Sequence, residues 1–174
     1  MIEPRQLMRA AALAGILAVS GGQAVPVAAA PADVALLKSY VGEWRGRGQM
    51  RGANTETVVC RLSLTEGNQD RVNYNGRCTL AGANLSIAGT LAYVDANRRF
   101  EAVMSSNTAF QGVAIGRKQG NNLVFNLRER DTSEGNDMTI TSNITLSGSQ
   151  ISVDFNVVDA KSGSTVSARV PFSK

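Results

Sequence analysis

The stretch that decides the fold is TVVCRLSLTEGNQDRVNYNGRCTL, residues 57–80. Both of its ends alternate apolar and polar residues, and the turn-rich segment GNQDR, residues 67–71, separates them. Folding one end back on the other as an antiparallel hairpin places Cys60 opposite Cys78. The neighbouring pairs fall on the same apolar face, Leu62 with Gly76 and Leu64 with Tyr74. The stretch therefore predicts a β-hairpin with one buried face that carries both cysteines.

The same alternation continues along the rest of the chain. From Trp44 onward apolar positions recur with period two, and turn residues return at intervals of about eight to twelve positions. Because a slip of one residue would turn an apolar face outward, sequential strands should pair as antiparallel neighbours. The expected pairs are Leu80 with Leu85, Cys78 with Ile87, Tyr74 with Leu91, Tyr93 with Phe100, Leu146 with Ile151 and Ile144 with Val153.

About ten such strands with one polar face would expose hydrophobic edges unless the sheet closes. We therefore expect an all-β fold, a single antiparallel up-and-down β-barrel over residues 42–174. A two-sheet sandwich is the alternative. Residues 30–41 are expected to form an N-terminal arm with a short helix at Asp33–Tyr40, because Asp33 can cap it and apolar residues recur at helical spacing.

Residues 1–29 have the pattern of a secretory signal peptide, in which Arg5 and Arg9 precede an apolar run and small residues follow. That run has about half of the roughly twenty residues that a membrane-spanning helix needs. We therefore expect a soluble periplasmic or secreted protein that does not span the membrane, or, if the segment stays uncut, an anchored one. In an oxidising compartment Cys60 and Cys78 should form a structural disulfide.

The chain contains no histidine, which excludes Ser-His-Asp and Cys-His catalysis, histidine-ligated haem and most zinc sites. Its carboxylates fall mostly in turns or on outward positions, where a solvated charge is the usual role. We therefore expect no enzyme, no metal site and no cofactor. The formal net charge of +4 is a mild basic excess and does not indicate a nucleic-acid partner.

Gly42-Glu43-Trp44 follows the helical segment and opens the first strand. This resembles the GxW motif of the lipocalins and the wider calycin superfamily, which includes fatty-acid-binding and nitrobindin-like barrels. The resemblance implies that Trp44 plugs one barrel end and that a basic residue of the last strand, Arg169 or as second choice Lys174, packs across it. It also implies binding of a small apolar molecule inside the barrel. Haem binding of the nitrobindin-like kind does not transfer, because no histidine is present to ligate iron.

The predicted inward positions combine small and aromatic side chains. Ten strands enclose more space than eight, so small inward residues should leave room for a ligand. Alternatively, the glycines let strands bend at barrel corners while neighbouring aromatics fill the gaps. The small positions are Gly46, Gly48, Gly76, Gly89, Ala102 and Ser142, and the candidate ligand-binding residues are Tyr74, Tyr93, Phe100, Met104, Phe125 and Phe155.

On the outer face, Arg45, Arg61 and Arg77 fall in one lateral row across three predicted strands, with Arg47 close by. Like charges directly opposite each other are destabilising, so the row suggests docking of an anionic partner such as lipid headgroups, cell-wall polymer or an acidic protein. An ordinary solvated face with interleaved glutamates is the alternative. Two functions are therefore expected: a non-enzymatic exported carrier of a small hydrophobic ligand, or an interaction protein such as a protease or lysozyme inhibitor or an envelope-associated protein.

Overall fold

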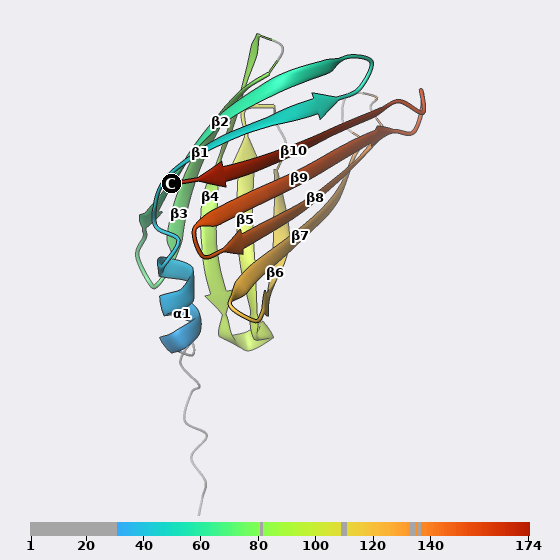
Figure 1. Cartoon of the computed structure of the whole chain (residues 1–174). Coiled ribbons are helices and arrows are strands. Elements are labelled where there is room, and N and C mark those ends of the chain that lie inside the picture. Colours follow the sequence, from blue (N-terminus) through green and yellow to red (C-terminus); the bar gives the residue numbers. More distant parts are fainter. Residues whose placement is uncertain (1–30, 81, 109–110, 133–134, 136) are drawn as a thin grey trace, which may run out of the picture.

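A computed structural model describes residues 31–80, 82–108, 111–132, 135 and 137–174. Within these residues ten antiparallel strands form one closed barrel, in which each strand pairs with its sequence neighbours and β1 pairs with β10 (Figure 1). The predicted up-and-down barrel is confirmed and the sandwich alternative is wrong. The predicted signal peptide lies outside the described residues. The elements are α1 (Pro31–Lys38), β1 (Gly42–Arg51), β2 (Thr55–Glu66), β3 (Val72–Leu80), β4 (Ala83–Val94), the 3-10 turn η1 (Asp95–Asn97), β5 (Arg99–Ser106), β6 (Gln111–Gln119), β7 (Asn122–Asp131), β8 (Met138–Ser147), β9 (Gln150–Asp159) and β10 (Thr165–Ser173).

The predicted pairing of β2 with β3 is confirmed. Cys60 lies opposite Cys78, and the two are joined by a disulfide. The predicted pairings of β4 with β5 and of β8 with β9 are confirmed as well, with Tyr93 opposite Phe100 and Leu146 opposite Ile151. Period-two patterning therefore assigned the inner and outer faces of these strands correctly.

The predicted register of β3 with β4 is wrong by two residues. Cys78 lies opposite Leu85 instead of Ile87, and Tyr74 lies opposite Gly89 instead of Leu91. A two-residue shift keeps every side chain on its predicted face. The observed register has a steric reason, because a Cβ atom at position 89 would lie only 2.7 Å from the Tyr74 hydroxyl oxygen. Glycine there leaves room for the tyrosine, whereas the predicted register would have set Tyr74 against a leucine.

Helix α1 begins and ends two residues earlier than the predicted Asp33–Tyr40. Asp33 therefore lies in the first turn of the helix instead of capping it, where its negative charge favours the helix dipole. Its carboxylate is 3.5 Å from the Lys118 ammonium at the end of β6. The helix is thus attached to the rim of the barrel and is not merely a lead-in to β1.

Candidate functional site

One end of the barrel is closed by the segment that joins α1 to β1. Leu37, Tyr40 and Trp44 are each at most 1% exposed. The Tyr40 hydroxyl donates a hydrogen bond to the Leu146 carbonyl at 2.9 Å, and Trp44 Nε1 donates one to the Tyr40 carbonyl at 3.0 Å. Burial raises the pKa of Tyr40 above its usual value, so its hydroxyl stays neutral and able to donate. These bonds hold the segment across the barrel end.

Lys174, and not Arg169, packs across Trp44. The Lys174 ammonium lies 4.8 Å from the centroid of the Trp44 ring, within cation–π range, and donates a hydrogen bond to the Val41 carbonyl at 3.0 Å. Arg169 instead pairs with Asp154 on the outer face. The reason is parity, because β10 residues at even positions point inward and Arg169 sits at an odd one. The basic partner of Trp44 was predicted to be Arg169, with Lys174 as the second choice, and the structure shows that it is Lys174.

The inner wall next to α1, here called the closed half, is fully packed. Phe100 and Phe125 meet edge to face with ring centroids 6.4 Å apart, and Tyr93 packs on Phe100 at 5.0 Å. A Cβ atom at Gly46 would lie 2.7 Å from the Phe172 ring, so the ring occupies the space that the glycine leaves. The closed half consists of Leu64, Val72, Leu91, Phe100, Leu123, Phe125, Leu146, Ile151 and Phe172, each at most 7% exposed.

The inner wall at the other end, here called the open half, is apolar but only partly covered. Its residues face inward by register, yet most keep an intermediate solvent exposure, although Val58 and Ile140 remain buried among them. Apolar surface inside the barrel is therefore in contact with water at the end opposite α1. The partly exposed residues are Met50, Leu80, Leu85, Ile87, Met104, Phe155, Val157, Val166 and Ala168.

The predicted ligand-binding residues are divided between the two halves. Phe100 and Phe125 belong to the packed closed half, with Tyr93 against them. Met104 and Phe155 lie in the open half on strands β5 and β9, and both are partly exposed. The last of the predicted ligand-binding residues, Tyr74, is hydrogen-bonded to the barrel wall. Its hydroxyl donates a hydrogen bond to the Val103 carbonyl at 3.0 Å. Only the residues of the open half are placed where a molecule entering the barrel would meet them.

Most residues of the open half were not among the predicted ligand-binding residues. Those predicted residues are aromatic apart from Met104, whereas the structure exposes aliphatic side chains such as Leu80, Leu85 and Val166. The period-two pattern already placed these residues inside, so the face was predictable. Their solvent exposure was not, because it depends on which barrel end α1 covers.

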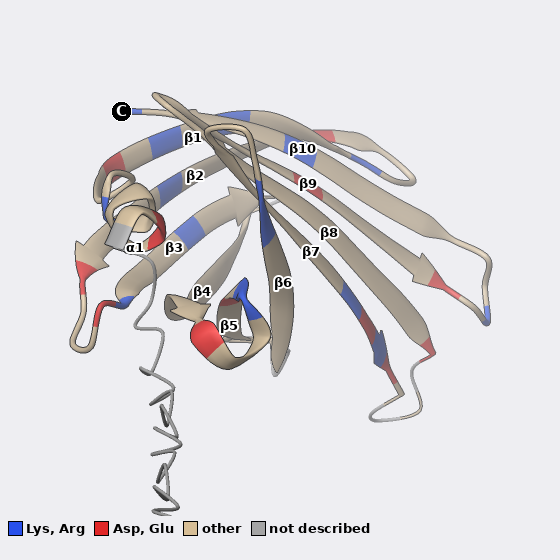
Figure 2. Ribbon diagram, turned by 90° about the horizontal axis from the view of Figure 1, so that it is seen from below, with Lys and Arg blue, Asp and Glu red and all other residues tan. Residues whose placement is uncertain are grey.

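The arginines of the predicted row lie on the outer face. Arg45 lies directly opposite Arg61, and Arg61 lies directly opposite Arg77, so the three occupy one line across β1, β2 and β3. Figure 2 shows the three basic segments side by side on these strands. Next to the row lies a hollow of about 460 Å³. A second outer groove, of about 810 Å³, is lined by both charges, since Asp154 and its partner Arg169 lie in it.

The described residues offer no candidate metal centre, because no three His, Cys, Asp or Glu side chains come together there. At the base of the loop between β7 and β8, the Asp137 carboxylate accepts two hydrogen bonds from Arg130, at 2.9 and 3.0 Å. The Arg130 guanidinium holds the pKa of Asp137 below its usual value. No helix in the described part of the chain is long and apolar enough to cross a bilayer.

Comparison with known proteins identifies the fold. No family model and no curated protein matches the chain. Among solved structures it is similar to Rv2717c from M. tuberculosis, with 12% identity over 81% of this chain and 96% of that one and a TM-score of 0.63. It is also similar to the S-type phycobiliprotein lyase CPES from Guillardia theta, with 9% identity over 80% and 90% of the two chains and a TM-score of 0.54. At such identities these likenesses show a shared barrel fold alone and carry no function.

Proposed function

We propose that this chain is a non-enzymatic member of the calycin superfamily that carries a small hydrophobic molecule in the open half of its barrel, in the periplasm or outside the cell. The observation that carries the proposal is the contrast between the two halves of one inner wall. The closed half excludes water, whereas the open half leaves inward-facing apolar side chains partly wetted. Covering such surface releases about 25 cal/mol for each Å² removed from water, which favours an apolar occupant.

The charged side chains that face into the open half indicate what charge a bound ligand can carry. Glu56 faces inward on β2 opposite Met50, and Glu129 faces inward on β7 opposite Ile140. Among the described inward positions of the open half there is no lysine or arginine. A fatty acid would bring its carboxylate into this wall with no basic side chain to pair with it, at a cost in desolvation. The proposed ligand is therefore neutral or cationic.

A neutral fluorescent probe tests the proposal. N-phenyl-1-naphthylamine brightens when it leaves water and carries no negative charge that the outer arginines would attract. We expect it to bind the purified protein, and Ala168→Phe to weaken that binding about tenfold or more by filling the open half. The matched control is Ser167→Phe, because Ser167 neighbours Ala168 on β10 but points outward.

Two results would contradict carriage inside the barrel. One is no brightening with the unmodified protein, and the other is an equal loss of binding in both phenylalanine variants. Circular dichroism shows whether each variant is folded. Native mass spectrometry of protein purified from its own host gives a second readout that needs no substitution, since a carrier should retain a small neutral or cationic molecule.

A further inference from the structure

The arginine row and the neighbouring Arg47 carry positive charges that have no carboxylate partner among the described residues. Arg45, Arg47, Arg61 and Arg77 are all exposed, and in the described part of the chain none of them forms an ion pair. Some other basic residues of the outer surface have carboxylate partners, as in the pairs Arg99–Glu101, Arg130–Asp137 and Arg169–Asp154. Other exposed arginines have no ion pair with the described carboxylates either, so what distinguishes the row is that its unpaired charges lie side by side. The nearest acid on β1, Glu43, instead accepts a hydrogen bond from Ser63. Within the described residues, no carboxylate therefore forms an ion pair with the row.

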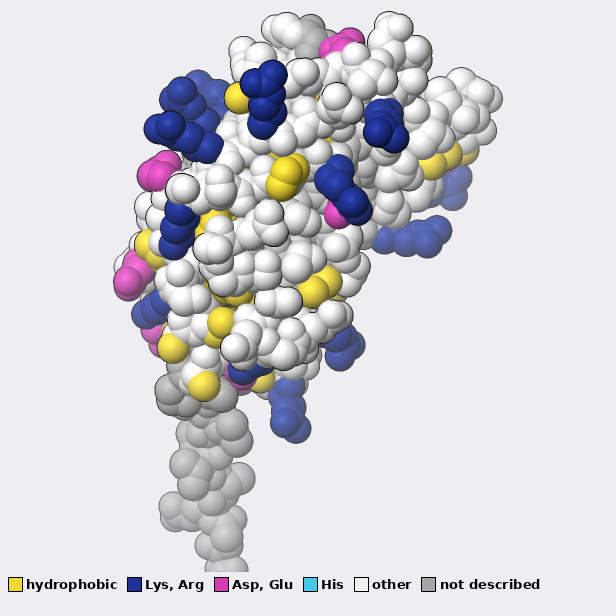
Figure 3. All heavy atoms as spheres, in the orientation of Figure 1, with side chains coloured by type: hydrophobic (Ala, Val, Ile, Leu, Met, Phe, Trp, Pro, Cys, Tyr) yellow, Lys and Arg dark blue, Asp and Glu magenta, His cyan; other side chains and the backbone are white. Residues whose placement is uncertain are grey.

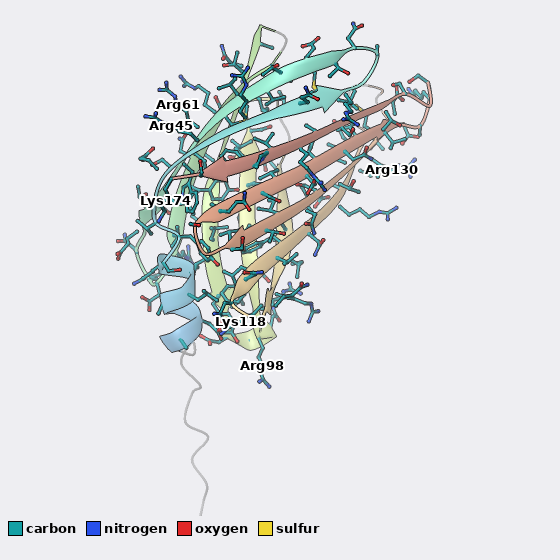
Figure 4. All side chains as sticks on the ribbon, viewed as in Figure 1. Arg45, Arg61, Arg98, Lys118, Arg130 and Lys174 are labelled. Carbon is teal, nitrogen blue, oxygen red and sulfur yellow. A yellow bond between two sulfur atoms is a disulfide. The ribbon has the colours of Figure 1, made fainter. Side chains whose placement is uncertain are left out.

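The fold holds these like charges together. Neighbouring strands lie about 4.8 Å apart, so three arginine stems in one row fall within about 10 Å. Opposed like charges on adjacent strands repel each other and destabilise the sheet. The Cys60–Cys78 disulfide joins the residue pair next to Arg61–Arg77, and so prevents β2 and β3 from sliding to separate the charges. Figure 4 shows Arg45 and Arg61 close together and pointing away from the barrel.

A hollow in the outer surface lies beside the arginine row. Arg45, Arg47 and Arg61 line it on one side, and Gln150 and Ser173 line it from β9 and β10. The residues around it include no aspartate or glutamate. Figure 3 shows basic side chains gathered on this part of the surface. A concave, basic site suits a compact anion better than it suits the flat surface of a bilayer.

The number of guanidinium groups indicates what kind of anion fits. One guanidinium can satisfy one carboxylate with two parallel hydrogen bonds, so a single carboxylate would leave most of the row unused. A ligand with several phosphate groups offers enough charged oxygens for all of them, and planar guanidinium forks suit phosphate oxygens. We propose that the arginine row and its hollow bind a soluble anion that carries two or more phosphate groups. This site lies on the outer face and is independent of the ligand inside the barrel.

Isothermal titration calorimetry with inorganic tripolyphosphate, in a phosphate-free buffer of about 0.1 M ionic strength, tests the proposal. Arg61 is the central member of the row, so Arg61→Gln should weaken binding about tenfold, and the triple change of Arg45, Arg61 and Arg77 to Gln about a hundredfold. The matched control changes Arg98, Arg117 and Arg128 to Gln, which removes the same charge from exposed positions elsewhere. The control should bind within about twofold of the unmodified protein, because distant exposed charges are screened by salt.

Four results would overturn the proposal. The first is absence of tripolyphosphate binding, and the second is an equal loss in the control triple, which would indicate a general charge effect. The third is row-dependent binding to phosphatidylglycerol vesicles without binding to tripolyphosphate, which would make the row a membrane-docking face. Binding of monophosphate as tight as that of tripolyphosphate would likewise overturn the need for several phosphate groups. Circular dichroism on every variant separates loss of binding from loss of folding, and removal of repelling arginines should not unfold the barrel.

Discussion

Breaking the Cys60–Cys78 bond should cost the barrel about 3 kcal/mol of unfolding free energy. The two cysteines are 18 residues apart in sequence, and in the chain-entropy account a cross-link over a loop of that length removes about this much freedom from the unfolded chain. The barrel would survive if its total stability lies in the usual range of about 5–15 kcal/mol, but it would become markedly less stable.

Guanidinium unfolding, followed by fluorescence, measures this effect. Trp44 is the only tryptophan of the chain and is 1% exposed when folded, so its emission reports on the closed end of the barrel. We would compare the oxidised protein, the protein reduced with a phosphine, and the double variant Cys60→Ala, Cys78→Ala. The reduced protein keeps both sulfur atoms in the wall, whereas the double variant does not, so their difference measures packing at Cys60 and Cys78.

This prediction is refuted if reduction lowers the unfolding free energy by less than about 1 kcal/mol. It is also refuted if the oxidised protein, once unfolded, shows two free thiols on titration. The double variant serves as the internal control, because the phosphine should leave its unfolding curve unchanged.

Three further predictions concern single side chains. Gly89→Ala should cost about 2 kcal/mol or more in chemical unfolding, because its Cβ would collide with the neighbouring strand and with the Tyr74 hydroxyl. Burial raises the pKa of Tyr74, so stability that is complete below pH ~10 should be lost as the pH rises further, and Tyr74→Phe should flatten that decline in unfolding curves taken between pH 8 and 11. Lys174→Met should lower the unfolding free energy by about 0.5–1 kcal/mol through loss of the cation–π contact with Trp44. Arg169→Met removes an exposed ion pair with Asp154 and should leave the emission of folded Trp44 unchanged, whereas Lys174→Met should shift it. A shift with Arg169→Met alone would show that the basic partner has been misassigned.

The sequence predicted which face each strand buries, but it left the registers ambiguous by multiples of two. Side-chain direction repeats every two residues, so Cys78 opposite Leu85 and Cys78 opposite Ile87 are equally compatible with the pattern. The steric demand of Tyr74 above Gly89 favours the observed register, and that contact spans three strands, since the tyrosine on β3 reaches a carbonyl on β5.

The candidate site was less predictable than the fold for a related reason. Whether an inward residue is buried or wetted depends on its height in the barrel and on which end is covered. Phe125 and Phe155 share the same pattern of alternation, yet one is 1% exposed and the other is partly open to solvent. The arginine row, by contrast, depended only on two adjacent registers, and the Cys60–Cys78 pair had already fixed that of β2 with β3.

Helix α1 and the last residue, Lys174, lie at the same end of the molecule, where the lysine sits over Trp44. An affinity tag or a surface linker added after Lys174 would therefore orient the molecule with its wetted rim toward the bulk liquid. Immobilised in this way, the protein should exchange small molecules freely, which makes sensor-chip measurements on the barrel practicable.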